Sequence, residues 1–215
     1  MSVLGFIALL ATPAAAQWVG VPVWNSPGSG SGITIDGDWG KPDSAYGKGN
    51  AFGGRASLGI GTLTVTAGIE SYKPEGASSS ITSIGGALAT RIIGGSLIPL
   101  SVNLQVGAAH SDSVNLSPTT YAPASTRITG AVGLAISLPT PGVSIEPYLS
   151  PGIRYTKLSN ASSGNSNFGY AIGANLTFGT FGLHLAYDNE HRTGGGSVGV
   201  FGLGAHVSLR VPLGM

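Results

Sequence analysis

Apolar and polar residues alternate with a period of two along most of the chain after residue 32. From Leu63 to Ile69 every second residue is apolar, and Thr64, Thr66 and Gly68 stand between them. Because successive side chains of a strand point to opposite faces of a sheet, this pattern predicts strands with one apolar face and one small or polar face. No segment has the period of an amphipathic helix. The pattern predicts ten strands, over residues 32–39, 51–60, 62–71, 81–92, 97–109, 126–138, 143–157, 167–178, 180–190 and 197–211.

The connections between the predicted strands alternate between long polar loops and tight turns. Because neighbouring strands of a meander run in opposite directions, all the long loops should lie at one end of the sheet and all the tight turns at the other. That asymmetry is typical of bacterial outer-membrane barrels, and a soluble β-sandwich does not require it. The long loops are predicted at 40–50, 72–80, 110–125, 158–166 and 191–196, and the tight turns at 61, 94–96, 139–142 and 179.

The charged side chains of the predicted strands fall on the face that carries small and polar residues. If the apolar face meets lipid, five acidic and five basic groups point into a barrel lumen, where they can neutralise one another. A slip of one residue would turn these side chains toward lipid. There a basic group costs about 2–4 kcal/mol at the bilayer midplane. We therefore predict a lumen charge network of Asp36, Asp38, Arg55, Glu70, Arg91, Arg127, Glu146, Arg154, Asp188 and Arg210.

Aromatic residues on the apolar face gather near the ends of the predicted strands. Six lie close to the long loops, and Phe178 and Phe181 flank a tight turn. Membrane barrels carry girdles of aromatic side chains where they cross the two membrane interfaces. The predicted girdle contains Trp39, Phe52, Tyr155, Phe168, Tyr170, Phe178, Phe181 and Tyr187.

The first residues have the features of an export signal. Residues 1–16 contain a short apolar core followed by Ala14 and Ala16, placed as in an A-x-A cleavage site, so we expect cleavage before Gln17. The alternative is a buried N-terminal strand. Residues 17–31 are rich in Pro, Gly and Ser and are expected to form a linker to a barrel domain at 32–215. Trp18 and Trp24 in this linker would either anchor at a membrane interface or pack into the lumen.

The composition supports a surface that is not fully solvated. Charged residues make up only 9% of the 215 residues, against about 25% in ordinary soluble domains. The formal net charge of +1 and the absence of a basic patch argue against nucleic-acid binding. The chain has no cysteine, which excludes disulfides, thiolate metal ligands and cysteine nucleophiles.

The region from 32 to 215 resembles the small bacterial outer-membrane β-barrel proteins, including porin-like ones. The resemblance is one of pattern, and Val207, Leu209 and Val211 supply the alternation expected of a last strand. The chain then ends at Met215 without a terminal Phe or Tyr. The resemblance implies an all-β, antiparallel up-and-down barrel of ten strands, with eight as the alternative.

For function, the resemblance implies a Gram-negative outer-membrane protein that is either structural and surface-exposed or a narrow passive pore for ions and small solutes. Its expected partners are outer-membrane lipid and the barrel assembly machinery, with an unspecified extracellular ligand. A secreted soluble β-sandwich that serves as a binding module is the main alternative.

Several residues suggest chemistry, and each set also has a structural interpretation. Asp36 and Asp38 should lie near Asp188, Glu190 and His191, and carboxylates beside a histidine can activate water. This arrangement loosely resembles the ten-stranded outer-membrane aspartate/histidine proteases, which have longer walls above the membrane. We expect an interior ion network here, with a hydrolase at the barrel rim as the alternative.

The remaining histidines are expected to have structural roles. His110, Ser111 and Asp112 contain the three residue types of a hydrolase triad, but adjacent residues rarely supply its geometry. His184 and His206 should point inward on paired strands, and two ligands are too few for a metal site. We therefore expect no catalytic residue, no cofactor and no metal.

Overall fold

The computed structural model describes residues 18–24, 32–95, 98–118 and 120–209. The predicted signal peptide at 1–16 and the predicted lumen residue Arg210 lie outside these ranges. Among the described residues, no helix has the length and apolar character needed to cross a membrane.

Ten long antiparallel strands form the body of the described chain. Each coincides with one of the ten predicted strands, with ends that differ by a few residues. Three short strands and one 3-10 helix, η1, complete the described elements. Their bounds are β1 Gly32–Pro42, η1 Ser44–Tyr46, β2 Asn50–Ile60, β3 Leu63–Lys73, β4 Ile81–Gly95, β5 Ile98–Ser111, β6 Val114–Ser117, β7 Thr120–Ala122, β8 Ser125–Ile136, β9 Leu138–Thr140, β10 Val143–Leu158, β11 Asn165–Phe178, β12 Phe181–His191 and β13 Ser197–Leu209.

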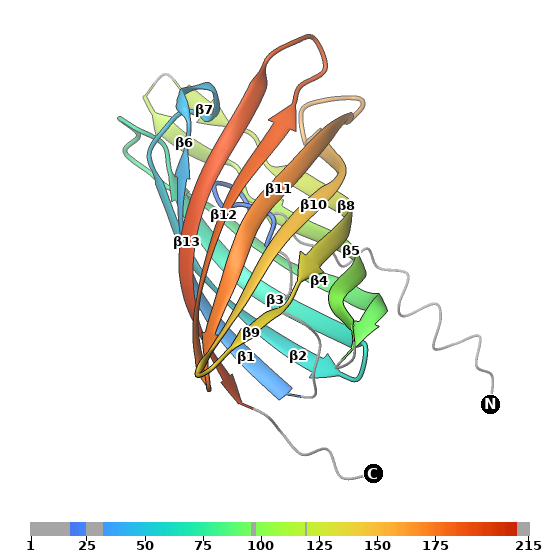
Figure 1. Ribbon diagram of the computed structural model, residues 1–215. Coiled ribbons are helices and arrows are strands. Elements are labelled where there is room, and N and C mark those ends of the chain that lie inside the picture. Colours follow the sequence, from blue (N-terminus) through green and yellow to red (C-terminus); the bar gives the residue numbers. More distant parts are fainter. Residues whose placement is uncertain (1–17, 25–31, 96–97, 119, 210–215) are drawn as a thin grey trace, which may run out of the picture.

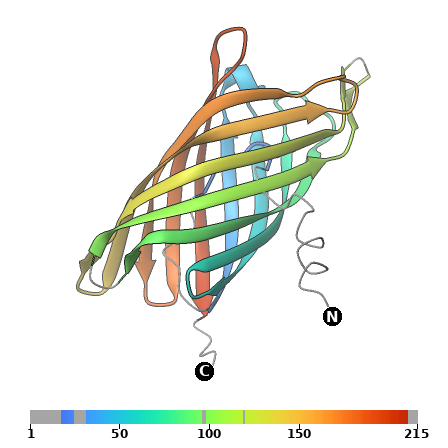
Figure 2. The ribbon, with the colours of Figure 1, turned by 90° about the vertical axis from the view of Figure 1, so that its right-hand side faces the viewer.

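The long strands close into a single barrel, as Figure 2 shows. Consecutive long strands pair in chain order, β13 pairs with β1, and β10 pairs with both β8 and β11, so the sheet has no free edge. A β-sandwich requires two separate sheets packed face to face. The closed ten-stranded sheet confirms the predicted barrel and excludes both the sandwich and the eight-stranded alternative.

The two ends of the barrel differ in the length of their connections. The β6–β7 hairpin and the β12–β13 loop project at the upper end in Figure 1, and the tight β2–β3 and β11–β12 connections lie at the lower end. These two turns contain Gly61 and Gly179, both with positive φ. The hairpin and η1 were not predicted, because short elements inside polar loops have no hydrophobic period to reveal them. Ser78 joins the hairpin to the β3–β4 loop through a backbone hydrogen bond of 2.8 Å to the carbonyl of Leu116.

The outer and inner faces of the barrel have opposite chemical character. Leu104, Ile172 and Phe181 are examples of large apolar side chains that are exposed on the outside. The inner face carries charged and hydroxyl side chains such as Glu70 and Thr66, and these are buried. This arrangement is that of a membrane barrel, whose apolar band faces lipid and whose interior is polar.

Candidate functional site in the barrel lumen

The segment from Trp18 to Trp24 lies inside the barrel and not on its surface. The two indoles are only 4% and 8% exposed. Trp18 Nε1 donates to the carbonyl of Gly68 on β3 at 3.1 Å, and the amide of Val23 donates to Asp188 Oδ2 on β12 at 2.8 Å. Because β3 and β12 are separated by three strands around the sheet, the segment crosses the lumen. We call these seven residues the luminal segment.

The luminal segment contributes to both apolar clusters found in the described part of the chain. The first cluster joins its residues to small and aromatic side chains of β2, β3 and β5, and the second joins them to β8, β10, β11 and β12. Residues 18–24 of the predicted linker are therefore part of the core, and the rest of that linker lies outside the described residues. Two roles were left open for Trp18 and Trp24, and in the structure both pack in the lumen. The clusters consist of Trp18, Val21, Ala51, Tyr72 and Ala109, and of Val23, Trp24, Ala135, Tyr148, Ala171 and Ala186.

Two glycines allow the luminal segment to approach the wall closely. Gly20 has a φ of +89°, a conformation that favours glycine, and its backbone lies against Ala51 and the Tyr72 ring. On β1, a Cβ at Gly40 would collide with the carbonyl oxygen of Gly20. A larger residue at either position would therefore displace the segment.

A cluster of ionisable groups on β1, β2 and β12 lies beside the segment. Arg55 Nε donates to Asp38 Oδ2 at 2.5 Å, and its Nη2 lies 3.3 Å from Asp36 Oδ1. Asp38 Oδ1 also lies 2.7 Å from His184 Nε2. The Arg55 guanidinium stands 5.5 Å from the centre of the Trp24 ring, within the range of a cation–π interaction.

Two further ion pairs lie toward the loop end of the lumen. Arg154 is fully buried, and its Nη2 lies 3.0 Å from Asp188 Oδ2. Arg127 pairs with Glu190 and donates a hydrogen bond of 2.9 Å to the Tyr46 hydroxyl. Glu190 was not in the predicted network, although it follows Asp188 with the period of two that would have placed it on the same inner face.

The other predicted members of the network have different surroundings. Glu146 is buried and accepts hydrogen bonds of 3.1 Å from both Ser137 Oγ and Asn175 Nδ2. Glu70 is buried against Gly53, where a Cβ would collide with its carboxylate. Arg91 is half-buried near the turn end of β4.

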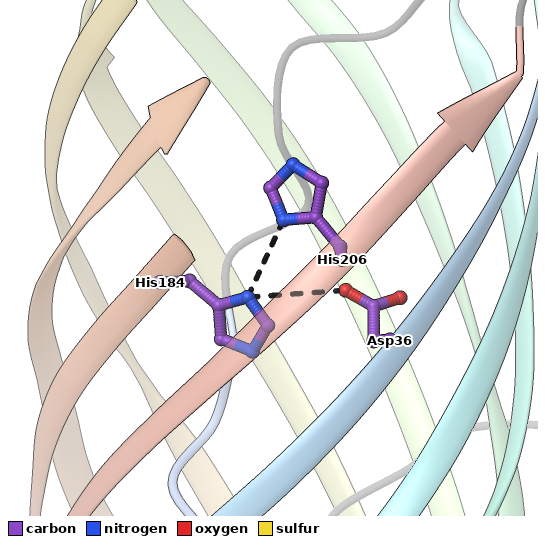
Figure 3. Close-up of side chains that lie close together, drawn as sticks. All are labelled: Asp36, His184 and His206. Atoms are coloured by element: carbon purple, nitrogen blue, oxygen red, sulfur yellow. Dashed lines mark hydrogen bonds and ion pairs between the residues drawn. The ribbon is translucent and has the colours of Figure 1, made fainter. Parts of the chain in front are cut away.

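Two histidines and one aspartate of the lumen bring possible metal ligands together, as Figure 3 shows. His184 Nδ1 lies 3.5 Å from His206 Nδ1 and 4.0 Å from Asp36 Oδ1. Asp36 stands directly opposite His206 in the β1–β13 register. Sequence reasoning found the histidine pair but missed this third ligand, which the pairing of the first and last strands would have revealed.

The predicted aromatic residues all lie on the outer face. Phe52, Phe168 and Phe181 are strongly exposed, and Trp39 is half-buried with its ring 6.3 Å from that of Phe201. Phe178 pairs with Phe181 across the tight turn after β11. Tyr155, Tyr170 and Tyr187 are partly exposed on the loop side of β10, β11 and β12.

The candidate catalytic sets are not assembled in the described chain. No hydrogen bond or ion pair among the described residues joins Asp188 or His191 to Asp36. The His191 ring instead stacks on the Phe168 ring, with 6.5 Å between the two ring centres. His110 is exposed on one face of β5, and its Nε2 lies 3.6 Å from Asp112 Oδ1. Ser111 is buried on the opposite face of the strand.

The comparisons with known proteins agree with the fold. No family model and no curated protein sequence matches the chain. The β-domain of the Bordetella autotransporter BrkA is similar with a TM-score of 0.52 and 14% identity, over 84% of this chain and 100% of that one. Neisserial surface protein A matches with a TM-score of 0.40 and 19% identity, over 86% and 100% of the two chains. The chain has the fold of the outer-membrane β-barrel proteins.

Proposed function

We propose that this protein is an integral β-barrel of the bacterial outer membrane, exported by residues 1–16, whose lumen is closed by its own luminal segment. It serves as a structural and surface-exposed element and not as an open pore. The apolar outer face and the aromatic residues near the strand ends support insertion into lipid. The observation that carries the closure is the luminal segment, which crosses the lumen from β3 to β12 with both tryptophans buried.

Side chains of the wall reinforce this closure. Ten strands enclose a narrow interior. Beside the luminal segment, the Arg154–Asp188 and Arg127–Glu190 pairs occupy the lumen toward the loop end. Ions and solutes would have to pass two buried guanidinium groups and the segment. The narrow pore is therefore the less favoured alternative.

The same contacts support a role without catalysis. Asp36 and Asp38 are engaged by Arg55, and Asp188 is engaged by Arg154 and by the amide of Val23. These contacts occupy the carboxylate oxygens, which are then not free to accept a proton from an attacking water. The parts of the protein available to partners are then the long polar loops, including the β6–β7 hairpin. The lipid bilayer and the barrel assembly machinery are the other proposed partners.

The closure is tested by conductance in planar bilayers. The chain starting at Gln17 should show no ion-conducting steps, whereas a variant that lacks residues 18–24 should conduct. Heat-dependent gel mobility checks that the shortened chain still forms a barrel. A synthetic peptide of residues 17–24 should close the variant again, and a scrambled peptide should not. Steady conductance by the intact chain, or none by the folded deletion variant, would contradict the proposal.

A further inference from the structure

The histidine pair in the lumen is formed by a reciprocal arrangement of glycine and histidine. In the β12–β13 register, Gly182 stands opposite His206 and His184 stands opposite Gly204. A Cβ at Gly204 would collide with the His184 ring, and a Cβ at Gly182 would collide with the His206 ring. Each imidazole therefore lies over the backbone of the neighbouring strand, and the two Gly-X-His sequences give both rings the space to do so.

The hydrogen bond between His184 and Asp38 directs the other nitrogen of the ring toward the cluster. Asp38 Oδ1 lies 2.7 Å from His184 Nε2, so a neutral His184 donates its Nε2 proton to this carboxylate. Nδ1 then carries a lone pair, and it lies 3.5 Å from His206 Nδ1. A carboxylate that holds the far nitrogen of a metal-binding histidine is a recurrent feature of metal sites.

The spacing and charge of the cluster suit a small divalent cation. Bond lengths of about 2.0–2.2 Å to zinc place neighbouring tetrahedral ligand atoms about 3.3 Å apart. The two Nδ1 atoms are already near this separation, and His184 Nδ1 lies 4.0 Å from Asp36 Oδ1. All the ligand atoms lie within 4.8 Å of one another, so binding would require a contraction of at most about 1.5 Å. Asp36 and Asp38 also share one guanidinium, that of Arg55, which leaves the carboxylates in excess.

We propose that Asp36, His184 and His206 bind a divalent transition-metal ion of the zinc type inside the barrel. Imidazole and carboxylate ligands suit Zn²⁺ and its first-row neighbours, and three protein ligands leave one coordination position open. Asp38 is a positioning residue that orients His184. The three ligands come from β1, β12 and β13, so the ion would link the first and last strands at the seam where the barrel closes. This proposal goes beyond the closed lumen and does not depend on it.

Zinc binding is tested on the untagged chain from Gln17, refolded in detergent with Zn²⁺ and then freed of excess metal. We expect one tightly bound Zn²⁺ per chain and a higher unfolding temperature with Zn²⁺ than after chelation, since an ion that binds only the folded state stabilises it. His184→Gln with His206→Gln should abolish this binding. Asp38→Asn should weaken it by about 10–100-fold, as loss of an outer partner of a ligand does.

The two exposed histidines provide the matched control. His110→Gln with His191→Gln removes the same number of imidazoles outside the cluster and should leave the stoichiometry and affinity unchanged. Zinc binding that survives in the His184/His206 variant, disappears in the control, or is absent from the intact chain would overturn the proposal. If the His184/His206 variant does not fold, X-ray absorption of the intact chain with Zn²⁺ decides. Two imidazole ligands are expected, and a shell of oxygen alone would contradict the site.

Discussion

The backbone amide of Val23 donates a hydrogen bond of 2.8 Å to Oδ2 of Asp188, and the same oxygen lies 3.0 Å from Nη2 of Arg154. One carboxylate on β12 therefore holds the luminal segment and neutralises a fully buried guanidinium on β10. Removing this carboxylate would affect both the closure of the lumen and the stability of the wall.

Asp188→Ala should destabilise the folded barrel strongly. Arg154 would remain buried without its partner, and breaking a buried ion pair from one side costs about 3–5 kcal/mol. The free energy of unfolding, measured in urea with detergent micelles or vesicles, should fall by that amount. Lys48→Ala is the matched control, because it breaks the exposed Lys48–Glu75 pair and should cost about 0–1 kcal/mol. Equal effects of the two substitutions would show that Asp188 is not buried beside Arg154.

Gly40→Val should displace the luminal segment without dissolving the barrel. The new side chain would collide with the carbonyl of Gly20, whereas valine itself favours a strand conformation. We expect the variant to keep its heat-dependent gel mobility and to conduct ions in planar bilayers. Gly37→Val is the control on the same strand, since no atom lies within 4 Å of a Cβ there. A closed Gly40→Val barrel would mean that Gly20 does not lie against β1.

Leu104→Arg tests whether the outer face meets lipid. Leu104 is exposed near the middle of β5, where an arginine facing the bilayer midplane costs about 2–4 kcal/mol. The unfolding free energy in phospholipid vesicles should fall by this amount. Ser159→Arg, in the exposed loop after β10, should change it by no more than about 0.5 kcal/mol. A similarly small effect at Leu104 would indicate an outer face in water.

The period of two shows which side chains share a face, and the barrel was predicted from it together with the alternating lengths of the connections, the position of the charges and the position of the aromatic residues. The ten strands follow from the period, and the inward position of Asp36 or Arg154 follows once the apolar face is assigned to lipid. In a membrane barrel the outward-facing side chains of the strands contact lipid and must be apolar, so few other folds fit this pattern. The same period of two places Glu190, two residues after Asp188, on the inner face and would have added it to the predicted charge network.

The contents of the lumen could not be predicted in the same way. Residues 18–24 have no period, and their fit depends on contacts with β3 and β12, strands distant in sequence. The Asp36–His206 contact likewise depends on the register between the first and last strands, which local patterns do not specify. The Gly-X-His sequences at 182–184 and 204–206 were a usable signal, since glycine opposite histidine makes room for a ring.

The most direct test of a closed membrane barrel uses its three tryptophans, of which Trp18 and Trp24 lie in the lumen and Trp39 lies on the outer face. In vesicles, a variant with Trp39→Phe should fluoresce with little quenching by either aqueous acrylamide or brominated lipid. A variant with Trp18→Phe and Trp24→Phe should be quenched by brominated lipid through Trp39. Strong acrylamide quenching of Trp18 and Trp24 would place the segment outside the lumen, and a Trp39 insensitive to brominated lipid would contradict the membrane barrel itself.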